Sequence, residues 1–175
     1  MGDYFTASQI SLAGRTFAQA EQMAGRYFRL HPQEWKAHRY DVKTLAYLDR
    51  HEVKKGAFAH LCKYEYAEGK EPEGRGRHFY RICLQDDSIL DAVERASFFV
   101  RLASLLLYIA AHELVHVIRF DRGDGDFDAG ERQKIEEEQA VHRITRNLLM
   151  PATDSDMKLV LDCFSDRYQI GDFIQ

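Results

Sequence analysis

The sequence predicts a single, mostly helical α+β domain with one small antiparallel β-hairpin. Three observations predict it: apolar residues recur at helical spacing over most of the chain, residues 57–85 have the composition of strands, and 45% of the 175 residues are hydrophobic. A chain of this length can bury one core and is too short to indicate two. We therefore expect residues 1–175 to form one domain.

The N-terminal part, residues 1–52, is expected to be helical. Apolar side chains recur at roughly helical spacing over residues 6–30, and His31-Pro32 should end that helix because a residue before proline is disfavoured in helical conformation. The same kind of spacing predicts a second helix over residues 33–50.

Residues 57–85 predict a β-hairpin. The stretches "AFAHLCKYEYA" and "RHFYRICLQ" are rich in aromatic and β-branched residues and show partial period-two alternation. Between them, "EGKEPEGRGR" at residues 68–77 is rich in glycine, proline and charge, which is typical of an exposed connection.

Residues 87–151 predict two long helices. The stretch "DDSILDAVERASFF" begins with residues favoured at a helix start and leads into the apolar run 102–111, so the first helix should extend to about Phe120. The glycine- and aspartate-rich "DRGDGDFDAG" then forms a loop, and the second helix should begin near Glu131 and end at Pro151.

The C-terminal segment, residues 152–175, is expected to contain one short helix over about residues 154–168. The run 102–111 in the preceding part is apolar on all sides but shorter than the roughly 20 residues of a membrane span, so we expect it at the centre of the domain rather than in a membrane.

Composition and charge argue against several classes of protein. A net charge of -4 from intermixed acids and bases lacks the basic footprint of nucleic-acid-binding proteins, so no direct nucleic acid binding is expected. The N-terminus lacks the basic start and apolar stretch of a signal peptide. Cys62, Cys83 and Cys163 are odd in number and far apart in sequence, which favours buried thiols in a reducing cytoplasm. We therefore expect a cytoplasmic protein; the oligomeric state is not predicted.

The stretch "HELVH" carries the candidate chemistry. His112 and His116 are four residues apart, so on a helix both imidazoles lie on one face and can reach a single ion. Glu113 is offset by about 100° and can hold a water bound to that ion. Zinc would make that water acidic and polarise a carbonyl, while the glutamate takes the proton, as in zinc peptidases. The alternative is two core histidines that bind only protein groups, with Glu113 at the surface.

Two histidines and a water leave a tetrahedral zinc one ligand short. The following helix can return antiparallel beside the first, and its candidate ligands are Glu136, Glu137 and Glu138. The apolar stripe through Val141 and Leu148 continues backwards to Glu137 or Glu138. A run of three acids could instead be a solvated helix face.

The stretch "AHELVH", followed about twenty residues later by "EEQAVHRITRNLLMP", resembles the ImmA/IrrE family of zinc metallopeptidases over about residues 108–151. The family pattern has A-H-E-L-G-H, then a glutamate, and finally L-L-M-P. Matching "LLMP" at residues 148–151 without a gap implies Glu138 as the third metal ligand. In the family pattern an alanine follows the ligand glutamate by three residues, so a match through Ala140 would instead select Glu137. We prefer Glu138.

Four positions depart from the family pattern: Val115 replaces a glycine, His142 replaces an asparagine or aspartate, and Thr145 and Arg146 replace small residues. His142 could orient a ligand as an outer partner, or it could itself bind the metal and close the site.

The resemblance implies a zincin-like fold in which the metal lies between two helices and the hairpin lines the substrate cleft. It further implies a zinc-dependent endopeptidase in which His112, His116 and Glu138 bind Zn²⁺ and Glu113 is the catalytic base. The expected partner is a protein or peptide substrate such as a transcriptional regulator. The alternative is a zincin-fold binding or regulatory protein with a structural metal or an inactive site.

Overall fold

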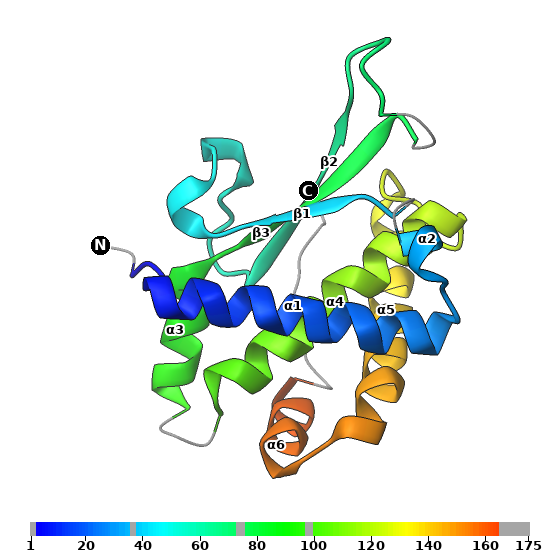
Figure 1. The fold of residues 1–175 in the computed structure, drawn as a ribbon. Coiled ribbons are helices and arrows are strands. Elements are labelled where there is room, and N and C mark those ends of the chain that lie inside the picture. Colours follow the sequence, from blue (N-terminus) through cyan, green and yellow to red (C-terminus); the bar gives the residue numbers. More distant parts are fainter. Residues whose placement is uncertain (1–2, 36–37, 73–75, 97–99, 165–175) are drawn as a thin grey trace.

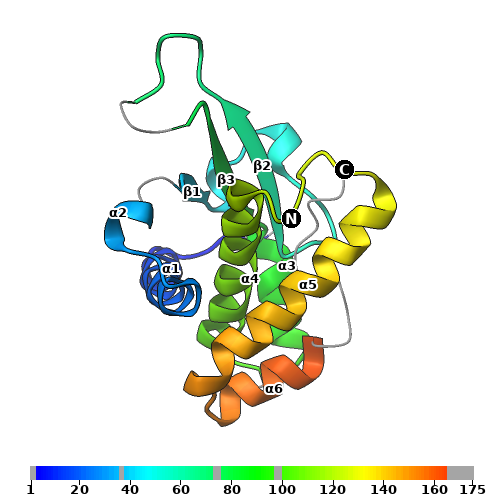
Figure 2. The same cartoon turned by 90° about the vertical axis from the view of Figure 1, so that its right-hand side faces the viewer.

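The computed structural model describes residues 3–35, 38–72, 76–96 and 100–164 (Figure 1). These residues form an α+β fold with six α-helices and a three-stranded sheet. The long helix α4 (Leu102–Arg122) lies between α1 (Ala7–Phe28) and α5 (Glu131–Leu149), and it also contacts α6 (Ser155–Phe164) (Figure 2). The α+β class predicted from the sequence is confirmed.

Helix α1 confirms the first predicted helix. It begins after Thr6, whose side chain accepts a hydrogen bond from the backbone N–H of Gln9, while the Gln9 side chain accepts one from Thr6. It ends at Arg29, which takes a left-handed conformation with φ of 54°. Its buried face includes Ala20 and Ala24, and these small side chains lie at 0% exposure in the core that α1 shares with α4.

The prediction of a helix over residues 33–50 is wrong. Among the described residues of this range, the α-helical part is the short α2 (Pro32–Trp35), and it is followed by strand β1 (Tyr40–Lys43) and the 3₁₀ turns η1 (Leu45–Tyr47) and η2 (Arg50–Glu52). Strand β1 pairs in parallel with a strand about forty residues later in the chain. This long-range pairing outweighs the local helical spacing.

The predicted hairpin is confirmed as β2 (Ala59–Glu65) and β3 (His78–Leu84), which are antiparallel. The strand order is β1-β3-β2, so the sheet is mixed and β2 is an edge strand. Leu61 and Ile82 are partners in the register and both lie in the core shared with α4. Side chains alternate along a strand, so the residues between them face the other side of the sheet.

The helices that follow the sheet differ from the prediction in one respect. Instead of one helix to Phe120, the chain forms α3 (Asp86–Arg95) and then α4, which begins after the extended residue Arg101. Helix α5 and the turn η3 (Met150–Ala152) confirm the predicted helix that ends near Pro151. Helix α6 agrees with the predicted C-terminal helix as far as Phe164, and residues 165–168 lie outside the described residues.

Helix α4 is long and apolar enough to cross a membrane, judged by length and composition alone. In the fold, however, 78% of its most apolar window is buried within the protein. It therefore forms the centre of the core, as its sequence predicted.

Candidate metal centre

Helix α4 contributes three polar side chains to the middle of the core. His112 and His116 are fully buried at 0% exposure, and Glu113 is buried at 1%. The two imidazoles lie one helical turn apart with ring centroids separated by 4.9 Å. The four-residue spacing thus brings both histidines to the same face, as predicted.

Helix α5 lies beside α4 and runs in the opposite direction (Figure 2). It places Glu138 opposite the two histidines. Its Oε1 is 3.0 Å from Nε2 of His116, and its Oε2 is 3.3 Å from Nε2 of His112. One ligand atom from each of these three residues lies within 4.8 Å of the other two. This buried group, which we call the His-His-Glu cluster, could hold a metal ion.

The other two acids of the run lie elsewhere. The side chain of Glu136 is 64% exposed and lies 3.7 Å from Arg132 on its own helix. Glu137 accepts two hydrogen bonds from Arg119, at 2.9 and 2.8 Å. The three candidates are therefore separated by geometry: one is in solvent, one is in an ion pair, and Glu138 joins the histidines.

Charges within the cluster oppose the effect of burial. Burial alone would raise the pKa of Glu138, but the neighbouring charges of His116 and His112 lower it far below its ordinary value. Burial would likewise lower the pKa of His116, but the charge of Glu138 and the hydrogen bonds with Glu137 and Glu138 together outweigh it and raise the pKa to about 10. Without a metal, a proton on His116 therefore balances the buried carboxylate.

A cation fits this cluster. Among the described residues, Nε2 of His112 and Oε2 of Glu138 are buried, lie 3.3 Å apart and form no hydrogen bond. Buried polar atoms without partners are rare and cost free energy, and an ion bound between them would supply the missing partner. Two imidazole nitrogens and one carboxylate oxygen form a donor set typical of Zn²⁺ sites that keep a position open.

Glu113 lies beside the cluster without belonging to it. Its Oε1 is buried and forms no hydrogen bond with any described residue. Burial raises the pKa of Glu113, and the charges of His112 and His116 offset part of that rise. A carboxylate whose pKa burial raises, next to a cation site, is suited to accepting a proton.

His142 borders the cluster from α5. Its ring centroid is 4.9 Å from that of His112, and its Nε2 is 3.9 Å from Oε2 of Glu138. The Tyr108 hydroxyl and Nδ1 of His142 form a hydrogen bond of 2.9 Å. Burial and the charge of His112 lower the pKa of His142 to about 4, so the ring is neutral at pH 7.

Sequence reasoning did not identify Tyr108 or Arg119. Tyr108 lies four residues before His112, so it continues the same helix face, and this spacing could have indicated it. Arg119 carries no such signal, because its partner Glu137 comes from another helix.

No family model, curated protein or solved structure matches this chain.

Proposed function

We propose that this protein is a zinc-dependent metallopeptidase. The observation that carries the proposal is the convergence of His112, His116 and Glu138 on one buried point, with the carboxylate of Glu113 beside it. The resemblance of residues 108–151 to ImmA/IrrE peptidases supports the same activity and a zincin-like fold.

Each residue of the site has a distinct role in this proposal. When bound, Zn²⁺ would polarise the scissile carbonyl and make a water molecule acidic. His112, His116 and Glu138 would hold the ion. Glu113 would accept the proton of the attacking water and transfer it to the amide nitrogen as the peptide bond breaks.

The edge strand β2 supports a peptide as the substrate. One edge of β2 pairs with β3, and the other is not paired with any strand of the described sheet. Such an edge can bind an extended peptide through backbone hydrogen bonds. We propose a protein substrate, and the family resemblance favours a cytoplasmic transcriptional regulator.

A second function is favoured by the position of His142. Its Nε2 lies 3.9 Å from Oε2 of Glu138, and if it moved to bind an ion held by Glu138, four protein ligands would close the site. The protein would then be a binding or regulatory protein with a structural zinc. His142→Ala tests this function: loss of an outer partner should weaken zinc binding by at most about 10–100-fold, whereas loss of one of four ligands should weaken it further.

Metal analysis tests the cluster directly. Purified full-length protein should contain zinc, measured by mass spectrometry of the metal, and Glu138→Ala should lose it. Glu136→Ala is the matched control, because that side chain is in solvent and its loss should leave the zinc content unchanged. Wild-type protein without affinity for zinc would contradict the proposal.

Hydrolysis of a mixture of internally quenched peptides tests catalysis. Glu113→Gln should retain zinc but lower the rate by about 10²–10⁴-fold, because the amide cannot take up the proton. Equal rates in the zinc-loaded wild type and Glu113→Gln, or no hydrolysis by either, would favour the binding protein.

A further inference from the structure

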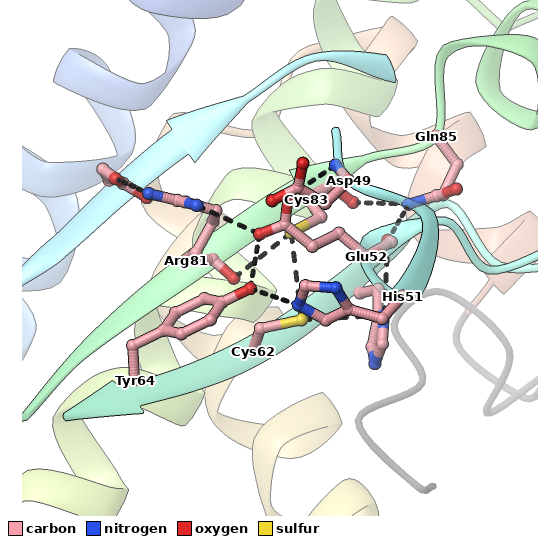
Figure 3. A network of polar contacts seen from close by, with 10 residues as sticks. Asp49, His51, Glu52, Cys62, Tyr64, Arg81, Cys83 and Gln85 are labelled. Carbon is pink, nitrogen blue, oxygen red and sulfur yellow. Dashed lines mark hydrogen bonds and ion pairs between the residues drawn. The ribbon is translucent and has the colours of Figure 1, made fainter. Parts of the chain in front are cut away.

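Two cysteines lie together on the face of the sheet that points away from α4 (Figure 3). In the register of β2 and β3, Cys62 is opposite Arg81 and Cys83 is opposite His60, so the cysteines are diagonal neighbours on one face. Their sulfur atoms are 4.0 Å apart, and the S–H of Cys83 donates to the sulfur of Cys62. The two cysteines are far apart in sequence, so the sequence alone did not predict that they would be neighbours.

The surroundings stabilise a negative charge on Cys62. The hydrogen bond from Cys83 lowers the pKa of Cys62 to about 5, although burial opposes this change. His60, whose Nδ1 lies 3.8 Å from the Cys62 sulfur, also lowers that pKa. The hydrogen bond with Cys62 in turn raises the pKa of His60. The hydrogen bond with Cys62 and burial raise the pKa of Cys83. At neutral pH the pair therefore comprises one thiolate and one thiol.

Other charges facing the pair are already balanced. Buried Glu52 opposes ionisation of Cys62 through its charge, but its carboxylate accepts hydrogen bonds from Tyr64 at 2.6 Å and from Arg81 at 3.1 Å (Figure 3). The Arg81 guanidinium also binds Asp41 through two hydrogen bonds of 2.9 Å. These hydrogen bonds hold the charged side chains of Glu52, Arg81 and Asp41 in place beside the cysteine pair.

The two sulfur-bearing residues differ in access. Cys62 is half-buried and lines a hollow of about 240 Å³ along the free edge of β2, together with His51 and Tyr64. Cys83 is fully buried at 0% exposure. A small reagent that enters the hollow therefore meets Cys62 first.

We propose that Cys62 is a peroxide-reactive cysteine and that Cys83 is its resolving partner. The Cys62 thiolate attacks a hydroperoxide, the O–O bond breaks, the sulfur is oxidised to sulfenic acid, and the leaving oxygen takes up a proton as water or alcohol. The Cys83 thiol then gives up its proton and its sulfur attacks the sulfenic sulfur; an S–S bond forms, the S–O bond breaks, and the leaving hydroxide takes up that proton as water. In sum, two thiols are oxidised to a disulfide and one hydroperoxide is reduced.

Closure of the disulfide requires movement. The sulfur atoms must approach from 4.0 Å to about 2 Å, and the two residues are diagonal rather than directly opposite. A bond formed under such strain is more easily reduced, so the oxidation should be reversed by dithiothreitol.

The same sulfur pair is not favoured as a metal site. A metal site needs at least three ligand side chains close together. Among the described residues, Cys62 and Cys83 are not part of such a group, whereas the residues of the His-His-Glu cluster are. The cysteine pair shares no side chain with the His-His-Glu cluster, although the charge of His60 acts on both Cys62 and Glu113. Oxidation of the cysteines and zinc binding are therefore tested by different measurements.

Peptide mapping of the full-length protein after titration with hydrogen peroxide tests the proposal. We expect a mass loss of about 2 Da and a cross-link between the peptides that contain Cys62 and Cys83, both reversed by dithiothreitol. Cys83→Ser should accumulate a sulfenic acid on Cys62 that dimedone labels. Exposed Cys163 on α6 provides the matched control, since Cys163→Ser should leave the cross-link unchanged.

Alkylation of the unmodified wild type with iodoacetamide gives a second test that needs no variant. Between about pH 8 and pH 6.5 the rate at Cys62 should change less than about twofold, whereas an ordinary thiol slows by on the order of tenfold or more. A mapped product without a Cys62–Cys83 bond, or a Cys62 rate that falls like that of an ordinary thiol, would overturn the proposal.

Discussion

Arg119 of α4 binds Glu137 of α5 through both carboxylate oxygens, with Nε 2.9 Å from Oε1 and Nη2 2.8 Å from Oε2. The same Oε1 is 3.7 Å from Nδ1 of His116. The ion pair thus joins the two helices next to the His-His-Glu cluster, and it places a fixed negative charge behind the imidazole that would bind the metal. Carboxylates in this position orient ligand histidines and strengthen their binding.

Glu137→Gln should therefore weaken zinc binding by about 10–100-fold without abolishing it. The amide keeps the size of the side chain but loses the charge that faces His116. Competition with a chromophoric chelator measures the effect, and Glu136→Gln, on the solvent face, should leave affinity unchanged. Complete loss of zinc in Glu137→Gln would instead make Glu137 a ligand, and unchanged affinity would deny it any orienting role.

The loop before α5 packs closely against this ion pair. A Cβ atom at Gly125 would lie 2.6 Å from Oε2 of Glu137, whose two oxygens Arg119 already holds. Gly125→Ala should therefore lower the free energy of unfolding by about 1–3 kcal/mol. Urea denaturation measures this change. Gly14→Ala, at an exposed helix position with open space around it, should raise stability by about 0.5–1 kcal/mol, and a loss there equal to that at Gly125 would contradict the packing argument.

The features predicted correctly from sequence depend on local geometry. The convergence of His112 and His116 follows from helical spacing alone. The preference for Glu138 needed one further step, the helical phase of α5 and the matched "LLMP", and the structure brings that residue to the histidines.

The features that were missed depend on contacts between distant segments. Strand β1 exists because Tyr40 to Lys43 pair with β3, and nothing within residues 33–50 reveals that partner. The expectation of three buried thiols also fails, because Cys163 is exposed and Cys62 is half-buried. The neighbourhood of Cys62 and Cys83 is set by the hairpin register, which composition does not specify.

Glu113→Gln should stabilise the metal-free protein at neutral and alkaline pH. Burial raises the pKa of Glu113 above its ordinary 4.5, so ionisation is costlier in the folded than in the unfolded chain. The resulting loss of stability is absent below pH 4.5 and grows as the pH rises through the folded pKa. Glutamine carries no such charge, so the melting temperature of the variant should exceed that of wild type at about pH 8. Each kcal/mol of added stability should raise the melting temperature by about 2–4 °C.

Melting curves recorded with a chelator present measure this difference. Near pH 4.5 the two proteins should melt at similar temperatures, because Glu113 is then protonated in the folded state. A variant that melts below wild type at about pH 8 would show that the Glu113 charge is compensated in the metal-free fold.

Glu52→Gln should destabilise the protein at neutral pH and much less in acid. Burial would raise the pKa of Glu52, but hydrogen bonds from Tyr64, the backbone of Asp49 and Arg81 outweigh it and lower the pKa from 4.5 to about 2. A depressed carboxylate pKa contributes stability that is fully present above pH 4.5 and is lost as the pH falls towards 2. Allowing for solvent screening near the sheet surface, the variant should lose about 1–3 kcal/mol at about pH 7 and roughly half of that or less at about pH 3. Urea unfolding at the two pH values measures both differences, and an equal loss at each would show that packing rather than charge makes Glu52 stabilising.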